Sequence, residues 1–188
     1  MRTRPYFFAL YGQLSLLVFL GVCVALHPGL VLKWNEAGLS NYGVHLKTAI
    51  PYTLAFALSG VFSLRAAQLT SVHDTPTRVL RVVLVAYAVL CLAALVSTYG
   101  YTDSPTLHHV HVVIGITFML FEPAASLWCY RRVRAARANR IWLGVEAAGL
   151  ALAVIDYEAV LHVLFLAQLL TGVGFGVLLV RAVRRVSA

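Results

Sequence analysis

The chain has 188 residues, of which 61% are hydrophobic and only 12% are charged, and its formal net charge is +8. Soluble domains average about 45–50% apolar and about 25% charged residues, and a domain of about 150 residues still exposes roughly 30% of its surface. The composition therefore excludes a soluble enzyme, a disordered protein and a small disulfide-stapled secreted module. We predict an all-α integral membrane protein whose chemistry, if any, lies inside or just above the bilayer.

Six apolar stretches follow one another along the chain, and a membrane-spanning helix needs about 20 such residues. The first stretch is longer than the apolar core of a secretory signal, so we expect an uncleaved spanning helix there. The fifth stretch is the shortest and contains Glu146. We predict a single transmembrane domain over residues 1–188, a polytopic helical bundle with spanning helices at about 6–26, 48–66, 79–100, 108–130, 140–156 and 158–180.

Basic residues are distributed unevenly over the loops of this six-helix arrangement. Every arginine falls on one side of the membrane, whereas the other side has only Lys33 and Lys47. Because Lys and Arg in short loops favour the cytoplasm, we expect a plasma-membrane protein with both termini and the arginine-rich loops inside the cell (N-in, C-in). The same bases favour anionic lipid headgroups, and we expect no nucleic-acid partner.

All histidines except His73 fall on the side that lacks arginine, together with several acidic residues. Histidine and carboxylate groups are the usual ligands of zinc and similar metals. Glu158 and His162 have an i,i+4 spacing that places them on one helix face, and His111 is the third candidate ligand of such a metal site. The alternatives are headgroup contacts, a haem site, and a role in proton handling or substrate contact. The candidate ligand or polar-pocket residues are His108, His109, His111, Glu158, His162, Asp103 and Asp156.

Two carboxylates, Glu122 and Glu146, lie inside predicted spanning helices. Ionisable groups in the bilayer cost at least a few kcal/mol and by default mark a functional or paired site. His111 and Glu122 are separated by about three helical turns, so they share a face that we expect to look into the bundle. Two interpretations stay open. One is a charge-compensated internal network that includes Arg65, and the other is a proton path or a polar pocket for a lipid headgroup.

Two short motifs carry a family resemblance. The loop before the second helix reads GLSNYG over residues 38–43, and HHVH at residues 108–111 begins the fourth helix. This arrangement resembles the six-helix DRAM/Sfk/PGAP-type membrane protein family and its bacterial relatives, in which an IS-x-x-G loop precedes helix 2. The resemblance implies a role in lipid organisation or membrane trafficking. It points to Ser40, Gly43 and one of the histidines at 108–111.

The leading functional hypothesis is a non-enzymatic membrane protein that binds lipid or is an accessory subunit of a larger membrane complex. The signatures of common enzymes are missing, and this hypothesis includes no cofactor. Its partners are membrane lipids, other membrane subunits or a second copy of the chain. One alternative is a small intramembrane enzyme or redox protein that uses the His/Asp/Glu cluster with zinc or haem. The other alternative is a proton-coupled carrier that uses Glu122 and Glu146.

Overall fold

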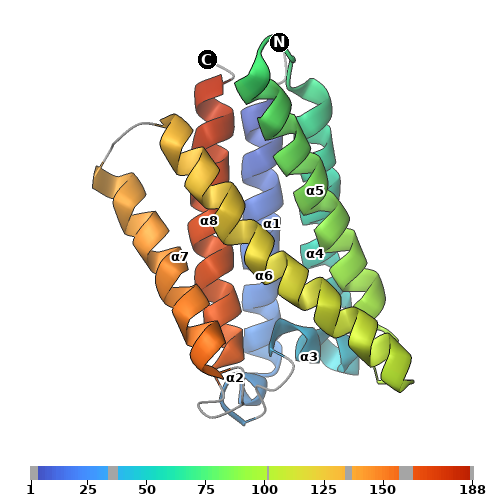
Figure 1. The fold of residues 1–188 in the computed structure, drawn as a ribbon. Helices are drawn as coiled ribbons and strands as arrows, with labels where there is room; N and C mark the ends of the chain where they lie inside the picture. Colours follow the sequence, from blue (N-terminus) through green and yellow to red (C-terminus); the bar gives the residue numbers. More distant parts are fainter. Residues whose placement is uncertain (1–3, 34–37, 101, 134–136, 157–162, 187–188) are drawn as a thin grey trace.

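The computed structural model describes residues 4–33, 38–100, 102–133, 137–156 and 163–186, and within these ranges it contains helices and no strand. Six helices are long and apolar enough to cross a membrane (Figure 1). The predicted all-α bundle with six spanning helices is therefore confirmed. The long helices are α1 (Pro5–Leu26), α4 (Leu46–Leu69), α5 (Thr75–Thr98), α6 (Pro105–Val133), α7 (Arg137–Ile155) and α8 (Leu164–Val186).

The connection between α1 and α4 contains short helices of its own. These are α2 (Gly29–Lys33), the 3-10 turn η1 (Gly38–Ser40) and α3 (Asn41–Val44). They lie beside one end of the bundle (Figure 1). The GLSNYG segment, which we expected to be a loop, is helical throughout, because residues 38–40 form η1 and residues 41–43 belong to α3.

Several long helices extend beyond their apolar cores. The α5 helix begins at Thr75 because Asp74 caps it. The Asp74 carboxylate accepts the Thr77 backbone N–H at 2.8 Å, and the Thr77 hydroxyl accepts the Asp74 N–H at 3.1 Å. The α8 helix continues to Val186, with Arg184 and Arg185 in its last turn, where cations interact favourably with the helix dipole. The predicted start of the last helix at residue 158 lies outside the described residues.

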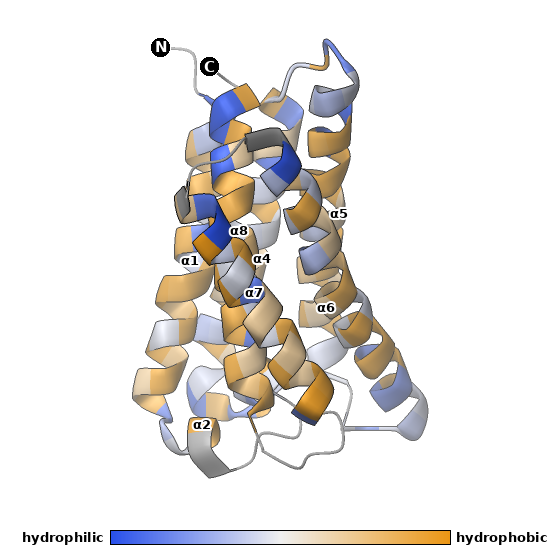
Figure 2. Ribbon diagram, turned by 60° about the vertical axis from the view of Figure 1, so that its left-hand side comes forward, coloured by the Kyte–Doolittle hydropathy of each residue, from blue (hydrophilic) through white to orange (hydrophobic). Residues whose placement is uncertain are grey.

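The long helices run up and down, so the first and last described residues lie at the same end of the bundle (Figure 1). We call this the arginine end, because it carries Arg4, Arg65, Arg78, Arg81, Arg131 and Arg184. The opposite end is called the histidine end, because it carries His27, His45, His108 and His109. Between the two ends the helices are predominantly hydrophobic (Figure 2), as expected for membrane-spanning segments.

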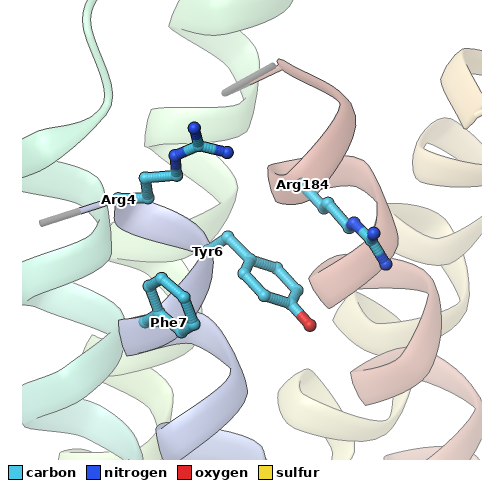
Figure 3. A pocket seen from close by; sticks show the side chains of 4 residues that line it. All are labelled: Arg4, Tyr6, Phe7 and Arg184. Atoms are coloured by element: carbon cyan, nitrogen blue, oxygen red, sulfur yellow. The ribbon is translucent and has the colours of Figure 1, made fainter.

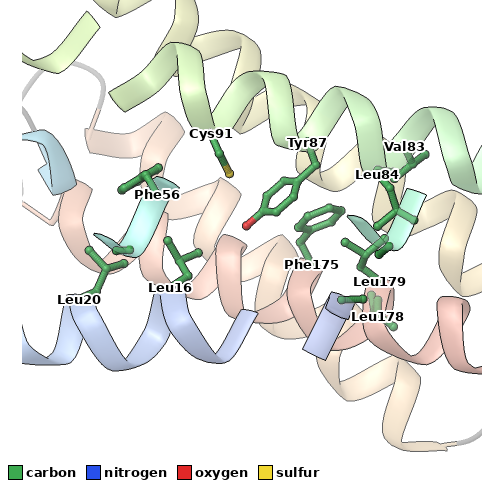
Figure 4. Packing of buried hydrophobic residues seen from close by; sticks show 14 of the residues in the cluster. Leu16, Leu20, Phe56, Val83, Leu84, Tyr87, Cys91, Phe175, Leu178 and Leu179 are labelled. Carbon is green, nitrogen blue, oxygen red and sulfur yellow. The ribbon is translucent and has the colours of Figure 1, made fainter. Parts of the chain in front are cut away.

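The packed core lies between α1, α4, α5 and α8. The rings of Tyr87 from α5 and Phe175 from α8 are 5.0 Å apart, and Leu16 and Phe56 close the same cluster (Figure 4). The Tyr87 hydroxyl is satisfied by the Ser59 hydroxyl at 3.1 Å, so this buried polar group does not interrupt the apolar packing. Ala125 and Cys129 of α6 pack against the same core.

Glycines allow α7 to approach α8 closely. A Cβ atom added at Gly149 would lie 2.7 Å from the carbonyl oxygen of Ala167, and one added at Gly174 would lie 2.9 Å from that of Trp142. Small residues at such positions are typical of membrane helix contacts, where close van der Waals packing holds the helices together. Gly149 and Gly174 therefore serve packing within the chain. The α7 helix contacts mainly α8 and makes few contacts with α6.

Candidate functional site

A cavity of about 650 Å³ lies in the half of the bundle next to the histidine end, between α6, α7 and α8. Its volume falls in the range of about 300–1,000 Å³ that is common for small-molecule sites. Most of its wall is aliphatic or aromatic. The polar side chains in the wall are Ser40, Tyr52, His108, His111, Glu122, Asp156 and Gln168.

The cavity opens sideways, between α6 and α7. Part of its wall consists of residues that are also on the outer surface, including Ile116 and Leu120 of α6 and Val154 of α7, which are 46%, 63% and 69% exposed. The two helices diverge toward the histidine end (Figure 1). Because these exposed residues are apolar and belong to spanning helices, this side of the opening faces the lipid around the bundle, and the exposed His108 lies at the end of the opening.

One polar chain of hydrogen bonds lies at the wall of this cavity. His111 of α6 is half-buried, and its Nε2 atom lies 2.8 Å from the Oγ of Ser40 at the end of η1. Its Nδ1 atom lies 2.8 Å from the Oγ of Ser97 in α5. One imidazole thus connects three elements, and of its two serine partners Ser40 lines the cavity together with His111.

The backbone just before Ser40 is fixed by the conformation of Gly38 and by a hydrogen bond from Leu39 to α8. Gly38 has a φ of +56°, a left-handed conformation that favours glycine. The next residue, Leu39, donates its backbone N–H to the Oε1 of Gln168 in α8 at 2.7 Å. Ser40 is therefore presented by a turn that is anchored to α8.

The second residue of the family-like loop, Gly43, is buried where a side chain would collide with Tyr52 and Thr98. Its neighbour Tyr42 is fully buried, and burial together with the nearby Cys23 raises the pKa of Tyr42 to about 12. The Tyr42 carbonyl oxygen accepts the Thr48 hydroxyl at 2.6 Å. Gly43 thus serves the packing of this loop onto α4 and α5, and it is not part of the cavity wall.

The acidic residues of the predicted sites occupy three different environments. Glu122 is 4% exposed and lines the cavity on the same face of α6 as His111. Asp156 is also buried at the cavity wall, and its carboxylate accepts the Val163 N–H at 2.9 Å. The Cβ of Glu146 lies beside Gly174 of α8, and its carboxyl group is near Ser126 of α6. Neither of its carboxylate oxygens has a hydrogen bond of normal geometry among the described residues.

The charge-compensated network with Arg65 is not formed within the described part of the chain. Arg65 is exposed, donates to the Oε1 of Gln68 at 3.1 Å, and lies over the ring of Phe8. Arg65 follows the buried Ser63 by two positions, which is about 200° around a helix of 3.6 residues per turn. The guanidinium therefore points away from the bundle interior in which Glu122 and Glu146 lie.

The remaining predicted ligands do not converge on a metal site within the described ranges. His108 is at the cavity wall but exposed, and His109 and Asp103 are exposed at the histidine end. Glu158 and His162, which with His111 made up the candidate metal site, lie outside the described residues. Among the residues that are described, no group of three or more His, Cys, Asp or Glu is placed to hold a metal ion.

Two residues of the site were not singled out from the sequence. Gln168 interrupts the apolar run of α8, and a lone amide in a spanning helix is a signal that marks it as a candidate. Ser97 carries no such signal, because it lies in an ordinary serine-threonine-tyrosine sequence at the end of α5. Its role becomes visible only through its contact with His111.

No family model, no curated protein and no solved structure matches the chain. The resemblance to the DRAM/Sfk/PGAP-type family therefore stays a prediction based on the two motifs. The cavity and the groups in its wall are the basis on which a function is assigned.

Proposed function

We propose that this integral membrane protein binds a single-chain amphiphile, such as a lysolipid or another single-chain acyl ester, in the cavity between α6, α7 and α8. The observation that carries the proposal is a largely apolar cavity that opens toward the lipid and has hydrogen-bonding groups near the histidine end. Apolar walls with a few placed polar groups are the usual composition of a small-molecule site. The acyl chain lies along α6, and the polar head lies against Ser40, His111 and Gln168.

The shape of the cavity favours a chain over a compact ligand. Its wall follows α6 from His108 to Glu122, which is about 21 Å at a rise of 1.5 Å per residue. Lipid tails are as apolar as leucine, so moving a chain from the bilayer into the cavity gains little hydrophobic free energy. Selectivity then comes from hydrogen bonds to the head, which are strong in a water-poor environment.

The orientation that we propose places the histidine end, and with it the polar part of the cavity, at the outer surface of the plasma membrane. The arginine end then contacts the anionic lipids of the cytoplasmic leaflet. At that end a smaller hollow of about 240 Å³ lies between Arg4, Tyr6, Phe7 and Arg184 (Figure 3). The Arg184 guanidinium lies 5.6 Å from the centre of the Tyr6 ring. Arg4 and Arg184 both line the hollow and are available there for contacts with lipid headgroups.

Filling the cavity tests the proposal. Gly115 lines the cavity and has no atom within 4 Å of an added Cβ, so Gly115→Phe places a ring in the space of the acyl chain. We expect bound amphiphile to fall at least about tenfold, which corresponds to ~1.4 kcal/mol and to the lower part of the usual cost of overpacking. Native mass spectrometry of the protein purified in mild detergent measures the retained lipid.

A matched control comes from α7. Gly144 also has no atom within 4 Å of an added Cβ, but it is exposed and does not line the cavity. Gly144→Phe should retain the same amount of lipid as the unchanged protein. Equal lipid retention by the two phenylalanine variants, or no retained lipid in the unchanged protein, would contradict the proposed function.

A further inference from the structure

The hydrogen bonds around His111 fit a neutral imidazole whose proton is on Nδ1. The Ser97 hydroxyl donates to the Ala94 carbonyl oxygen at 3.1 Å, and a carbonyl oxygen can only accept. When its single proton is used there, Ser97 Oγ accepts from Nδ1–H of His111 across 2.8 Å. The neutral imidazole has then no proton on Nε2, and Nε2 accepts the hydroxyl proton of Ser40 across 2.8 Å.

This is the arrangement that activates a serine. A nucleophilic serine needs a base within about 2.6–3.2 Å, and that base must itself be oriented by a third group. Here Nε2 of His111 faces the hydroxyl of Ser40, and Ser97 orients the ring from the other side. Both Ser40 and His111 line the cavity, so a bound molecule reaches the serine from the inside of the bundle.

The wall that contains Ser40 also contains a side-chain amide. The Oε1 of Gln168 accepts the Leu39 N–H at 2.7 Å, which leaves the amide NH₂ of Gln168 as the donor end in the cavity wall. The Tyr52 hydroxyl also interacts with Ser40, but its proton is directed elsewhere. It lies 3.0 Å from the Thr98 hydroxyl, which donates to the Ala94 carbonyl oxygen at 2.7 Å and therefore accepts from Tyr52. Side-chain amides are among the groups that stabilise the oxyanion of acyl transfer.

We propose that Ser40 is a nucleophile and His111 its general base, and that together they cleave the acyl ester of a single-chain lipid held in the cavity. This inference rests on the proposed function, because the lipid must first bind there. The substrate class follows from the surroundings, since an acyl chain occupies the apolar part of the cavity and its ester carbonyl lies at the polar end. Ser97 acts through His111 and is a positioning residue.

The reaction proceeds in two balanced steps with water as the second reactant. The Ser40 oxygen attacks the ester carbonyl carbon, and the hydroxyl proton passes to Nε2 of His111. The bond from the carbonyl carbon to the alcohol oxygen then breaks, and the alcohol leaves with the proton from Nε2. Water attacks the acyl-serine, gives one proton to Nε2 and releases the fatty acid, and this proton returns to the Ser40 oxygen.

The test uses the full chain purified in mild detergent and an alkyl fluorophosphonate, which labels activated serines covalently. We expect labelling at Ser40, found by peptide mass spectrometry, and release of fatty acid from monopalmitoylglycerol or palmitoyl lysophosphatidylcholine in mixed micelles. The two substrates distinguish a neutral from a zwitterionic head. Ser40→Ala should abolish labelling, and His111→Gln should slow labelling and hydrolysis at least about 100-fold, the lower limit for general-base catalysis.

The matched control is Ser63→Ala, which changes another buried serine whose hydroxyl has no partner among the described residues. It should label and hydrolyse like the unchanged protein. Native mass spectrometry of Ser40→Ala shows whether the variant is folded and still binds lipid, which keeps the two proposals distinguishable. If the unchanged protein retains lipid but neither labels at Ser40 nor releases fatty acid, the inference is wrong and lipid binding stands. If it retains no lipid, the proposed function itself fails.

Discussion

Replacing Gly174 by valine should lower the free energy of unfolding by about 3 kcal/mol, the upper end of the usual cost of overpacking. A Cβ at this position would lie 2.7 Å from the Cβ of Glu146 and 2.9 Å from the carbonyl oxygen of Trp142. Because the second contact is with backbone, the two helices must move apart, and α7 then loses its main packing partner. Thermal unfolding in detergent, followed by circular dichroism, measures the loss.

The control for this variant is again Gly144 on α7, where an added Cβ meets no atom within 4 Å. Gly144→Val introduces the same side chain on a free surface, and such changes usually stay within about 0.5 kcal/mol. If Gly174→Val and Gly144→Val unfold at the same temperature, the close approach of α7 and α8 is not what holds α7 in place.

Replacing Glu146 by leucine should stabilise the protein by about 2 kcal/mol. The Glu146 side chain is 1% exposed, and its two oxygens have no hydrogen-bond partner among the described residues. An unsatisfied buried polar group costs about 1–3 kcal/mol, and a charged one in a bilayer costs more. Glu146→Gln keeps a buried polar group and should gain much less. The same unfolding measurement compares the three proteins.

A leucine variant that is less stable than the unchanged protein would contradict this expectation. The carboxyl group would then make a favourable contact, such as one with a bound cation or a proton-carrying group. That result would favour the proton-coupled carrier that the two buried glutamates suggested from the sequence, and a loss of proton-coupled flux in Glu146→Gln would support it.

Features that depend on local sequence were predictable. The apolar stretches predicted six spanning helices, because each helix must satisfy its own backbone in lipid and needs a minimum length to do so. Helical periodicity placed His111 and Glu122 on one face, and both line the cavity. The helix ends were less predictable, since the cap at Asp74 and the arginine-containing last turn of α8 continue helices beyond their apolar cores.

Features that depend on how distant elements pack were not predictable. Ser40 and His111 are 71 residues apart in the chain, and their hydrogen bond depends on how η1 lies against α6. The two motifs pointed to both residues but gave no sign that they are partners. The hydrogen bond from Leu39 to Gln168 joins residues that are 129 positions apart, and it likewise depends on how η1 lies against α8. Arg65 does not join a charge network with Glu122 and Glu146, because its position around α4 points its side chain outward.

An experimental structure of the protein purified from its own membrane shows directly whether a single-chain amphiphile occupies the cavity. We predict elongated density in the cavity along α6, from Ser40 and His111 toward Glu122, with its polar end within hydrogen-bond distance of the Ser40 hydroxyl. Density of that shape would be that of an amphiphile which entered between α6 and α7. A structure in which α6 and α7 pack directly against each other, with no cavity between them, would contradict lipid binding at this place.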